Sequence, residues 1–134
     1  MPRYERLDGG RTTFAIAADP AGAPRLLHFG ARLSDSLDLR EIDTAMQMGV
    51  RESTPDVRIS PTLYPAAGMG WFGEPAIEGV HDGGDGAIAW SSATLERQGQ
   101  SIVITLMDQR TQLRVCLTSV LDPDTGVLAC GVSV

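Results

Sequence analysis

The sequence predicts a mostly β protein, an antiparallel β-sandwich with one short helix. Apolar residues alternate with polar ones in several short runs, which is the pattern of half-buried strands. Connections of hairpin length, rich in Gly, Pro and Asp, separate these runs. With 134 residues the chain is long enough for one core. We therefore expect residues 1–134 to form a single β-sandwich domain.

The first quarter of the chain predicts two neighbouring strands. In the run RTTFAIAAD, the side chains of Thr12, Phe14 and Ile16 share one face. A turn is expected at residues 19–22, where Asp, Pro, Ala and Gly stand together. Residues 24–29 then form a second short strand, and both strands belong to an antiparallel meander.

One segment, residues 38–48, departs from the alternation. Its apolar residues recur at a helical spacing, at Leu39, Ile42, Ala45 and Met46. Asp38 is placed to cap the N-terminus of this helix. We expect one or two turns of amphipathic helix lying over a sheet edge.

Two runs in the C-terminal part of the chain have the period of strands. Their repeating apolar positions are Ile102, Ile104 and Leu106 in the first run and Leu113, Val115 and Leu117 in the second. Connections of hairpin length lie at residues 97–100, 109–112 and 122–126. We expect each run to pair with the next in the antiparallel sense.

The last run, residues 127–134, is expected to pair with the strand before it. It stops in the middle of a strand pattern, without a polar tail. We therefore expect the chain to be the first part of a larger domain, with an unpaired strand edge and an uncovered apolar face. Symmetric pairing of chains would cover both, so a homo-oligomer is expected.

Composition restricts the partners and the location of the protein. The net charge of −6 argues against nucleic acid or an anionic membrane as a partner, since both need a basic surface. No apolar run approaches the roughly 18 to 20 residues of a membrane span. The N-terminal sequence MPRYERLDGG lacks the apolar core of a signal peptide. We expect a cytoplasmic protein.

The two cysteines predict neither a disulfide framework nor a metal site. Cys116 and Cys130 flank the turn expected at 122–126, so they could lie near each other on paired strands. In the cytoplasm they are expected to stay reduced, as two small buried thiols. No His or second Cys pair stands at zinc-site spacing, so we expect no metal and no cofactor.

No catalytic motif stands out in the sequence. His28 lies in an apolar run, where a core or edge histidine with a hydrogen-bond partner is the simpler interpretation. His81 and Asp82 could form a general base with its orienting carboxylate. They lie on the Gly-rich loop 79–86, however, with no cleft partner in the sequence. A small enzyme that uses these two residues is the weakest hypothesis.

The most informative segment is residues 60–79, where Trp71 and Phe72 stand side by side in a loop shaped by Gly and Pro. These aromatic rings either close the end of the sandwich or present a flat apolar face outward. A flat aromatic face suits a sugar ring. In the second case, Tyr64 and Arg58 would line the same surface.

These residues resemble the N-terminal domain of glycoside hydrolase family 36, the bacterial α-galactosidases. The matching landmarks follow the chain in order: LLHFG at 26–30, Arg58, LYP at 63–65, FGEPA at 72–76 and LDPDTGVL at 121–128. The chain departs from the family at Phe29, where Trp is frequent, and at Tyr64, where Leu is common.

The resemblance implies a partial galactose-mutarotase-like supersandwich, the first part of a larger N-terminal domain. The family's catalytic (β/α)₈ barrel lies downstream and needs about 250 residues, so the chain alone is expected to be inactive. The resemblance also implies that the module supports the barrel and oligomerisation. Arg58, Trp71 and Phe72 would bind an α-galactoside or another carbohydrate without doing the chemistry.

A second hypothesis comes from a different functional class. The chain could be a free-standing β-sandwich that binds a carbohydrate or a protein partner and has no barrel. The gene sequence after residue 134 would separate the two hypotheses, because a barrel pattern there favours the enzyme module.

Overall fold

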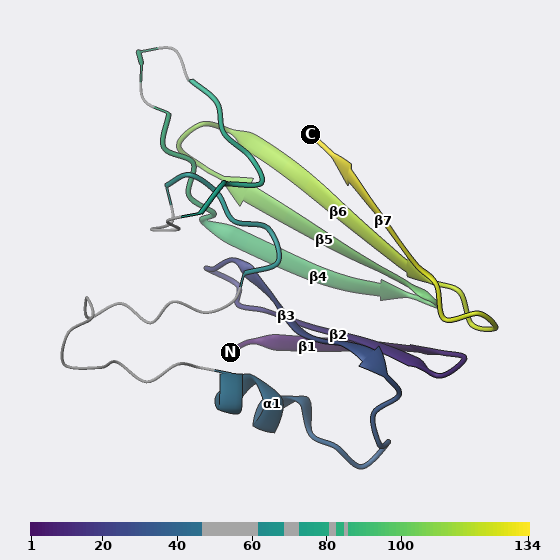
Figure 1. The fold of residues 1–134 in the computed structure, drawn as a ribbon. Helices are drawn as coiled ribbons and strands as arrows, with labels where there is room; N and C mark the ends of the chain where they lie inside the picture. Colours follow the sequence, from purple (N-terminus) through teal and green to yellow (C-terminus); the bar gives the residue numbers. More distant parts are fainter. Residues whose placement is uncertain (47–61, 69–72, 81–82, 85) are drawn as a thin grey trace.

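A computed structural model describes residues 1–46, 62–68, 73–80, 83–84 and 86–134. Within these residues, seven strands form two antiparallel sheets that stack face to face, and one short helix lies outside them (Figure 1). The strands are β1 (Arg3–Gly9), β2 (Thr12–Ala18), β3 (Pro24–Ala31), β4 (Ser92–Gln98), β5 (Ser101–Asp108), β6 (Leu113–Leu121) and β7 (Leu128–Ser133), and the helix is α1 (Leu39–Met46). The predicted mostly β fold with one short helix is confirmed.

The core lies between the two sheets. The first sheet has the order β1-β2-β3 and the second has the order β4-β5-β6-β7. Alternate residues of the strands point into the shared core, as the sequence period predicts. The largest fully buried core side chains are Leu7, Phe14, Ile16, Ile102, Ile104, Leu106 and Leu121, and Trp90 is almost fully buried in the same core.

Strand β1 is not predicted by the sequence pattern. Four of its seven residues are charged, and Leu7 is its one fully buried hydrophobic side chain. Its backbone pairs with β2 over its full length, from Arg3 opposite Ala18 to Gly9 opposite Thr12. Pairing with an apolar neighbour therefore forms this strand, because its own sequence has no apolar alternation.

A β-bulge in β3 changes which side chains face the core. Ile16 lies opposite Leu26 and Ala15 lies opposite His28, which leaves Leu27 as the extra residue. The shift places Phe29 opposite Phe14, where the two rings make an edge-to-face contact with centroids 6.2 Å apart. Strict alternation along 24–29 could not predict this contact.

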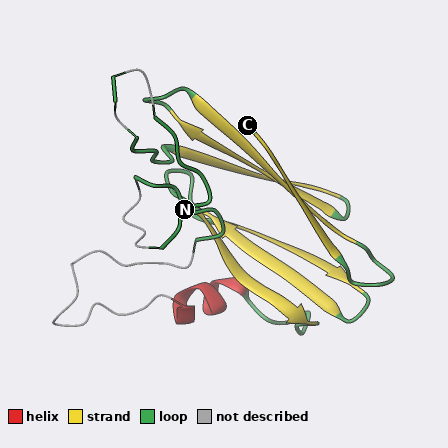
Figure 2. Ribbon diagram, turned by 45° about the horizontal axis from the view of Figure 1, so that its top comes forward, coloured by secondary structure: helices red, strands yellow, loops and turns green. Residues whose placement is uncertain are grey.

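Helix α1 covers the outer face of the first sheet (Figures 1 and 2). Its N-terminus is capped as predicted, because the Asp38 carboxylate accepts a hydrogen bond from the Arg40 backbone N–H at 2.9 Å. The apolar residues of the helix pack against the small side chains Ala15 and Ala17 of the central strand. The prediction that the helix lies over a sheet edge is therefore wrong. Small residues on β2 leave room for the helix over the face.

The second sheet extends beyond the first at β7. The inner faces of β4, β5 and β6 are buried, whereas β7 is exposed along its length apart from the half-buried Leu128. Val132 lies opposite the buried Leu117 and is itself 56% exposed. The first sheet therefore does not reach under β7. The predicted pairing of the last run with the strand before it is confirmed.

The two cysteines lie on opposite faces of the second sheet. Cys130 lies opposite the buried Ser119, on the inner side, whereas Cys116 is three residues from Ser119 along β6 and points outward. Both thiols are free, with Cys116 half-buried and Cys130 exposed. The expectation of a buried thiol is wrong for Cys130, because β7 has no covering layer. The register that pairs Cys130 with Ser119 places the two thiols on opposite faces.

Two turns join the sheets at one end. The Gly10 backbone N–H donates to the Pro123 carbonyl at 2.6 Å, across from the first sheet to the β6–β7 turn. Gly126 adopts a φ of 72°, and a Cβ atom there would lie 2.5 Å from the Thr12 hydroxyl oxygen. Glycine is required here because of both the backbone angle and the close approach.

No helix in the described part of the chain is both long and apolar enough to cross a membrane.

Candidate functional site

The three residues expected to bind sugar, Arg58, Trp71 and Phe72, lie outside the described residues. His81 and Asp82, which belong to the weakest catalytic hypothesis, also lie outside them. The structure does describe the segments that lead to the two aromatic residues and away from them. We call residues 62–80 the aromatic loop, and its described parts, 62–68 and 73–80, are the base of that loop.

The base of the aromatic loop rests on the core through Trp90. This side chain is buried just before β4, and its indole N–H donates to the Tyr64 carbonyl at 3.3 Å. The Tyr64 and Trp90 rings lie with centroids 6.2 Å apart. Tyr64 is half-buried and packs against the main core. Tyr64 therefore attaches the loop to the core, and its place in an outward ligand surface stays a prediction.

Backbone contacts close the base of the aromatic loop on itself. Ala66 and Ile77 form an isolated parallel β-bridge, and the Ala76 backbone N–H donates to the Pro65 carbonyl at 2.8 Å. These contacts bring the segment before Trp71 and Phe72 next to the segment after them. The loop is therefore closed at its base, and its ends have a defined separation.

Gly68 is the point where the aromatic loop touches the chain before β4. Its backbone N–H donates to the Ile88 carbonyl at 2.8 Å. A Cβ atom at this position would lie 2.5 Å from the same carbonyl oxygen. Only glycine allows this approach, which explains one of the glycines that shape the loop.

Beyond these anchors the described base reaches the surface. Gly68 is exposed before the two aromatic residues, and Gly73 and Glu74 are exposed after them. The two described segments of the loop therefore lead from the core to the protein surface.

A buried ionic network lies beside the start of this loop. Arg25 of β3 is 8% exposed and Asp43 of α1 is 3% exposed. The Arg25 guanidinium donates to both oxygens of the Asp43 carboxylate, Nε to Oδ1 at 2.9 Å and Nη2 to Oδ2 at 2.8 Å. It also binds Asp19, and the Tyr4 hydroxyl donates to Asp43 Oδ2 at 3.0 Å. This network connects the helix to the first sheet.

The pKa values of the network follow from these contacts. Hydrogen bonds from Arg25 lower the pKa of Asp43 despite its burial, and the hydrogen bond to Asp43 raises the pKa of Arg25. Burial raises the pKa of Tyr4, and its bond to Asp43 adds to the effect. The sequence contains no local signal of this network, because its members come from four separate segments.

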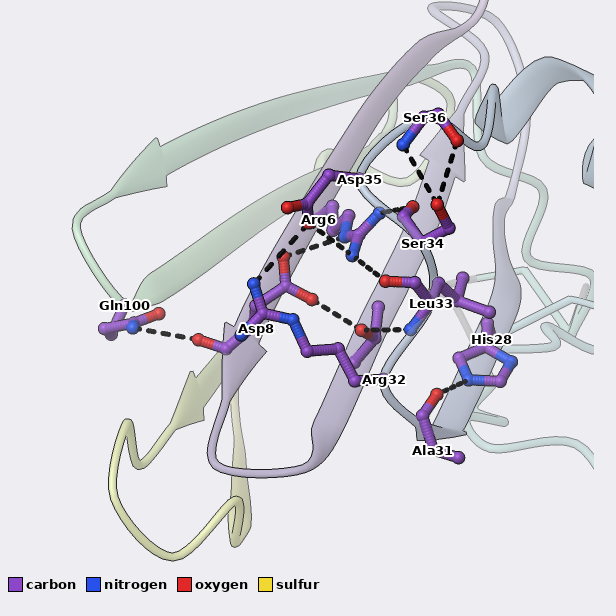
Figure 3. A network of polar contacts seen from close by, with 11 residues as sticks. Arg6, Asp8, His28, Ala31, Arg32, Leu33, Ser34, Asp35, Ser36 and Gln100 are labelled. Carbon is purple, nitrogen blue, oxygen red and sulfur yellow. Dashed lines mark hydrogen bonds and ion pairs between the residues drawn. The ribbon is translucent and has the colours of Figure 1, made fainter.

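A second polar network fixes the connection between β3 and α1 (Figure 3). The Arg6 guanidinium binds the Asp8 carboxylate at 2.8 Å and donates to the carbonyls of Leu33 and Ser34 at 2.6 and 2.8 Å. The Thr13 hydroxyl donates to Asp8. Burial raises the pKa of Asp8, but these hydrogen bonds outweigh it and the pKa is lowered.

His28 has a structural partner. Its Nε2 atom lies 2.9 Å from the Ala31 carbonyl, at the end of the same strand (Figure 3). This contact agrees with the interpretation of His28 as an edge histidine.

Four of the described carboxylates are arranged as hydrogen-bond acceptors that favour the ionised form. The pKa is lowered for Asp8, Asp43, Asp108 and Asp122. Asp108 is buried, which raises its pKa, but it accepts backbone N–H bonds from Ala89 and Arg110 at 3.3 and 2.9 Å that outweigh the burial. A general acid needs the opposite shift. These four side chains organise turns and ion pairs.

Among the described residues, no three His, Cys, Asp or Glu side chains group in a way that could hold a metal ion. A small apolar pocket of about 280 Å³ lies at the end of the sandwich near the aromatic loop. It is lined by Gly79, Val80, Ala87, Ile88, Thr111, Gln112 and Leu113. None of these described lining residues carries a charged side chain.

Comparison with known families gives one finding. A family model described as the glycosyl hydrolase family 36 N-terminal domain matches residues 22–134. The match covers most of the chain, including β3, α1, the aromatic loop and the whole second sheet. A comparison with curated proteins found no match.

Proposed function

The chain belongs to the glycosyl hydrolase family 36 N-terminal domain family, and from this premise we propose that it lines a sugar-binding site and supports oligomerisation in a cytoplasmic α-galactosidase-like enzyme. Membership identifies it as a non-catalytic module of a glycoside hydrolase. The two free cysteines support a reducing compartment. The observation that carries the sugar-binding part is the closed base of the aromatic loop.

The physical argument for sugar binding starts from the loop base. Tyr64, Gly68 and the Ala66–Ile77 bridge hold the loop to the core, and both of its arms reach the surface. A loop with fixed ends loses less conformational entropy on binding than a free loop does. Trp71 and Phe72 would supply the stacking face, and Arg58 would supply forked donors for sugar hydroxyl groups. The module would thus orient substrate beyond the cleaved bond.

The two tryptophans of the chain allow a direct test by fluorescence. Trp90 is buried in the core, so an α-galactoside titration should change the emission of Trp71 alone. We expect the signal to persist in Trp90→Phe, which keeps a core ring, and to vanish in Trp71→Ala. Binding measured by calorimetry should be at least about two- to tenfold weaker in Trp71→Ala, because an aromatic contact is worth about 0.5–1.5 kcal/mol beyond its burial.

Thermal melting of the same variants decides between stacking and core closure. If Trp71 binds sugar, Trp71→Ala should melt like the parent chain. A core aromatic residue would instead cost about 3–5 kcal/mol on truncation, enough to unfold a domain of this size. A collapsed melting transition in Trp71→Ala would remove the binding role of Trp71.

The chain by itself should not hydrolyse a chromogenic α-galactoside. A retaining glycosidase needs two carboxyl groups about 5–5.5 Å apart, one of them with a raised pKa. The described carboxylates with shifted pKa values all shift downward. Turnover by the purified chain that disappears on changing one of its Asp or Glu residues would refute this part of the proposal.

The oligomerisation part of the proposal rests on β7. In the described part of the chain, three of the four edge strands are protected against pairing with another chain. Strands β1 and β4 have charged residues, and β3 is bridged to Thr62. Strand β7 has neither a charged residue nor a proline, and its edge is open. Antiparallel pairing of β7 with β7 of a second copy would place no like charges opposite each other.

Light scattering tests this interface with a matched pair of variants. The parent chain should be a dimer at high concentration, and Val132→Lys on β7 should be a folded monomer. Thr94→Lys, an exposed change on the β4 edge, should leave the dimer intact. A parent chain that stays monomeric at high concentration would contradict the proposal and favour a strand of the same polypeptide as the partner of β7.

A further inference from the structure

Residue Arg25 makes two kinds of contact that no other described residue combines. Its side chain holds Asp43 on α1 through two hydrogen bonds, on the outer face of the first sheet. Its backbone forms an isolated antiparallel bridge with Thr62, at the edge of β3. Asp43 precedes the connection 44–61, and Thr62 follows it. Both ends of that connection therefore meet one residue of β3.

The edge contact at Thr62 is built from few bonds. The Leu63 backbone N–H donates to the Pro24 carbonyl at 2.7 Å, and the Thr62 hydroxyl donates to the same carbonyl at 3.3 Å. A two-residue bridge of this kind gains stability when the chain that leads to it is already held nearby, because less loop-closure entropy is lost. Asp43 is such a nearby attachment point, because the Arg25 side chain binds it.

The side chain of Arg25 is suited to this double role. Its guanidinium uses Nε and Nη2 on Asp43 and Nη1 on Asp19, so the side chain is fixed in one geometry. The Tyr4 hydroxyl of β1, the opposite edge strand of the sheet, donates to Asp43 at 3.0 Å. A fixed side chain in turn fixes the strand segment whose backbone receives Thr62.

We propose that Arg25 is a positioning residue that fixes helix α1 and the start of the aromatic loop to the same stretch of β3. When Arg25 and Asp43 are paired, the chain between the two attached residues runs over residues 44–61. When the pair is broken and the apolar contacts of α1 also open, that stretch begins after Ser34, whose carbonyl Arg6 binds, and runs over residues 35–61. The longer stretch costs more entropy to close, so the Thr62 bridge opens more often.

Amide hydrogen exchange at Leu63 measures this opening directly. In Asp43→Asn we expect Leu63 to exchange up to about twofold faster than in the parent chain, from the longer stretch of chain alone. Arg25→Lys keeps the charge but loses the forked geometry, so it should give a smaller increase. The matched control is Asp8→Asn, which breaks the comparable Arg6–Asp8 pair of the same sheet and should leave Leu63 unchanged.

All variants are compared at a temperature where circular dichroism shows each of them folded. Unchanged Leu63 exchange in folded Asp43→Asn would overturn the proposal, and so would an equal increase in Asp8→Asn. If Asp43→Asn does not fold, Arg25→Lys replaces it, because that change removes the forked donors that bind Asp43. Leu63 exchange that stays at the parent value in folded Arg25→Lys then overturns the proposal.

A second readout rests on the proposed sugar-binding function. We expect α-galactoside affinity to fall by at most about twofold in folded Asp43→Asn, because affinity follows the population of the closed bridge. Reversal of the pair, Arg25→Asp with Asp43→Arg, should recover part of both readouts. If the parent chain binds no α-galactoside, the proposed function fails while the Leu63 measurement still decides the role of Arg25. Weaker affinity with unchanged Leu63 exchange would overturn the positioning role alone.

Discussion

The two sheets share one core but differ on their outer sides. The outer face of the first sheet is covered by α1, and two arginine networks attach the neighbouring connections to it. The outer face of the second sheet has no such cover within the described residues, and Val120 on it is 42% exposed. Strand β7 is exposed on both faces.

This difference shows which interactions make each sheet. Both sheets pair strands that are neighbours in sequence. The second sheet follows from local hairpins and alternating apolar residues. The first sheet also makes side-chain contacts with distant segments, such as Arg25 with Asp43 and Arg6 with Leu33. We expect the first sheet to be sensitive to changes on its outer face and the second sheet to be tolerant there.

The largest expected effect comes from the buried ion pair of the first sheet. Asp43→Ala leaves the buried Arg25 with Asp19 as its remaining carboxylate, and we expect a loss of about 3 kcal/mol in the free energy of unfolding. Urea denaturation followed by circular dichroism measures it. Asp35→Ala is the control, because Asp35 is 82% exposed and its ion pairs with Arg6 and Arg32 should contribute about 0–1 kcal/mol. Equal losses in the two variants would contradict the comparison.

Acid should weaken the first sheet through the same carboxylate. The folded pKa of Asp43 is lowered, so its contribution is complete above the unfolded value of about 3.9 and is lost as the pH falls through the folded pKa. Protonation of Asp43 removes its charge but keeps the side chain, whereas Asp43→Ala removes both. The loss in the free energy of unfolding at low pH is therefore at most equal to the loss in Asp43→Ala. The free energy of unfolding, measured by denaturation between neutral and low pH, should therefore depend less on pH in Asp43→Asn than in the parent chain. Identical pH profiles would show that Asp43 does not contribute.

Side-chain truncation on the two outer faces gives the next effect. Leu27 is 5% exposed under α1, and Leu27→Ala should cost about 2–3 kcal/mol. Val120→Ala, on the outer face of the second sheet, should change stability by less than about 0.5 kcal/mol. Thermal melts of the two variants measure the difference. If Val120→Ala proves as costly as Leu27→Ala, a covering layer lies over the second sheet as well.

The smallest expected effect concerns two glycines. Gly68→Ala brings a methyl group against the Ile88 carbonyl oxygen and should cost about 1–3 kcal/mol, with the strain confined to the base of the aromatic loop. Gly131→Ala on β7 meets nothing within 4 Å and should be neutral. Urea denaturation of both variants tests this pair. A neutral Gly68→Ala would mean that the loop base moves away from Ile88 without cost.

Sequence reasoning was most successful for the second sheet and for the helix. The alternation at 102–107 and 113–118 predicts β5 and β6, and the spacing from Leu39 to Met46 predicts α1 with its Asp38 cap. These signals are local, because strand period, helix period and capping depend on residues close in sequence. The sugar-binding role of Arg58, Trp71 and Phe72 stays a prediction.

The sequence by itself determined the β class, the hairpin order and the amphipathic helix, since each depends on side-chain period and turn residues over short stretches. The tertiary structure alone decided the placement of α1 over a face, the strand β1, the bulge at Leu27 and the opposite faces of Cys116 and Cys130. It also decided the Arg25 network and the role of Trp90 under the aromatic loop. These features join segments far apart in the chain, and their energy depends on burial and geometry that no local pattern encodes.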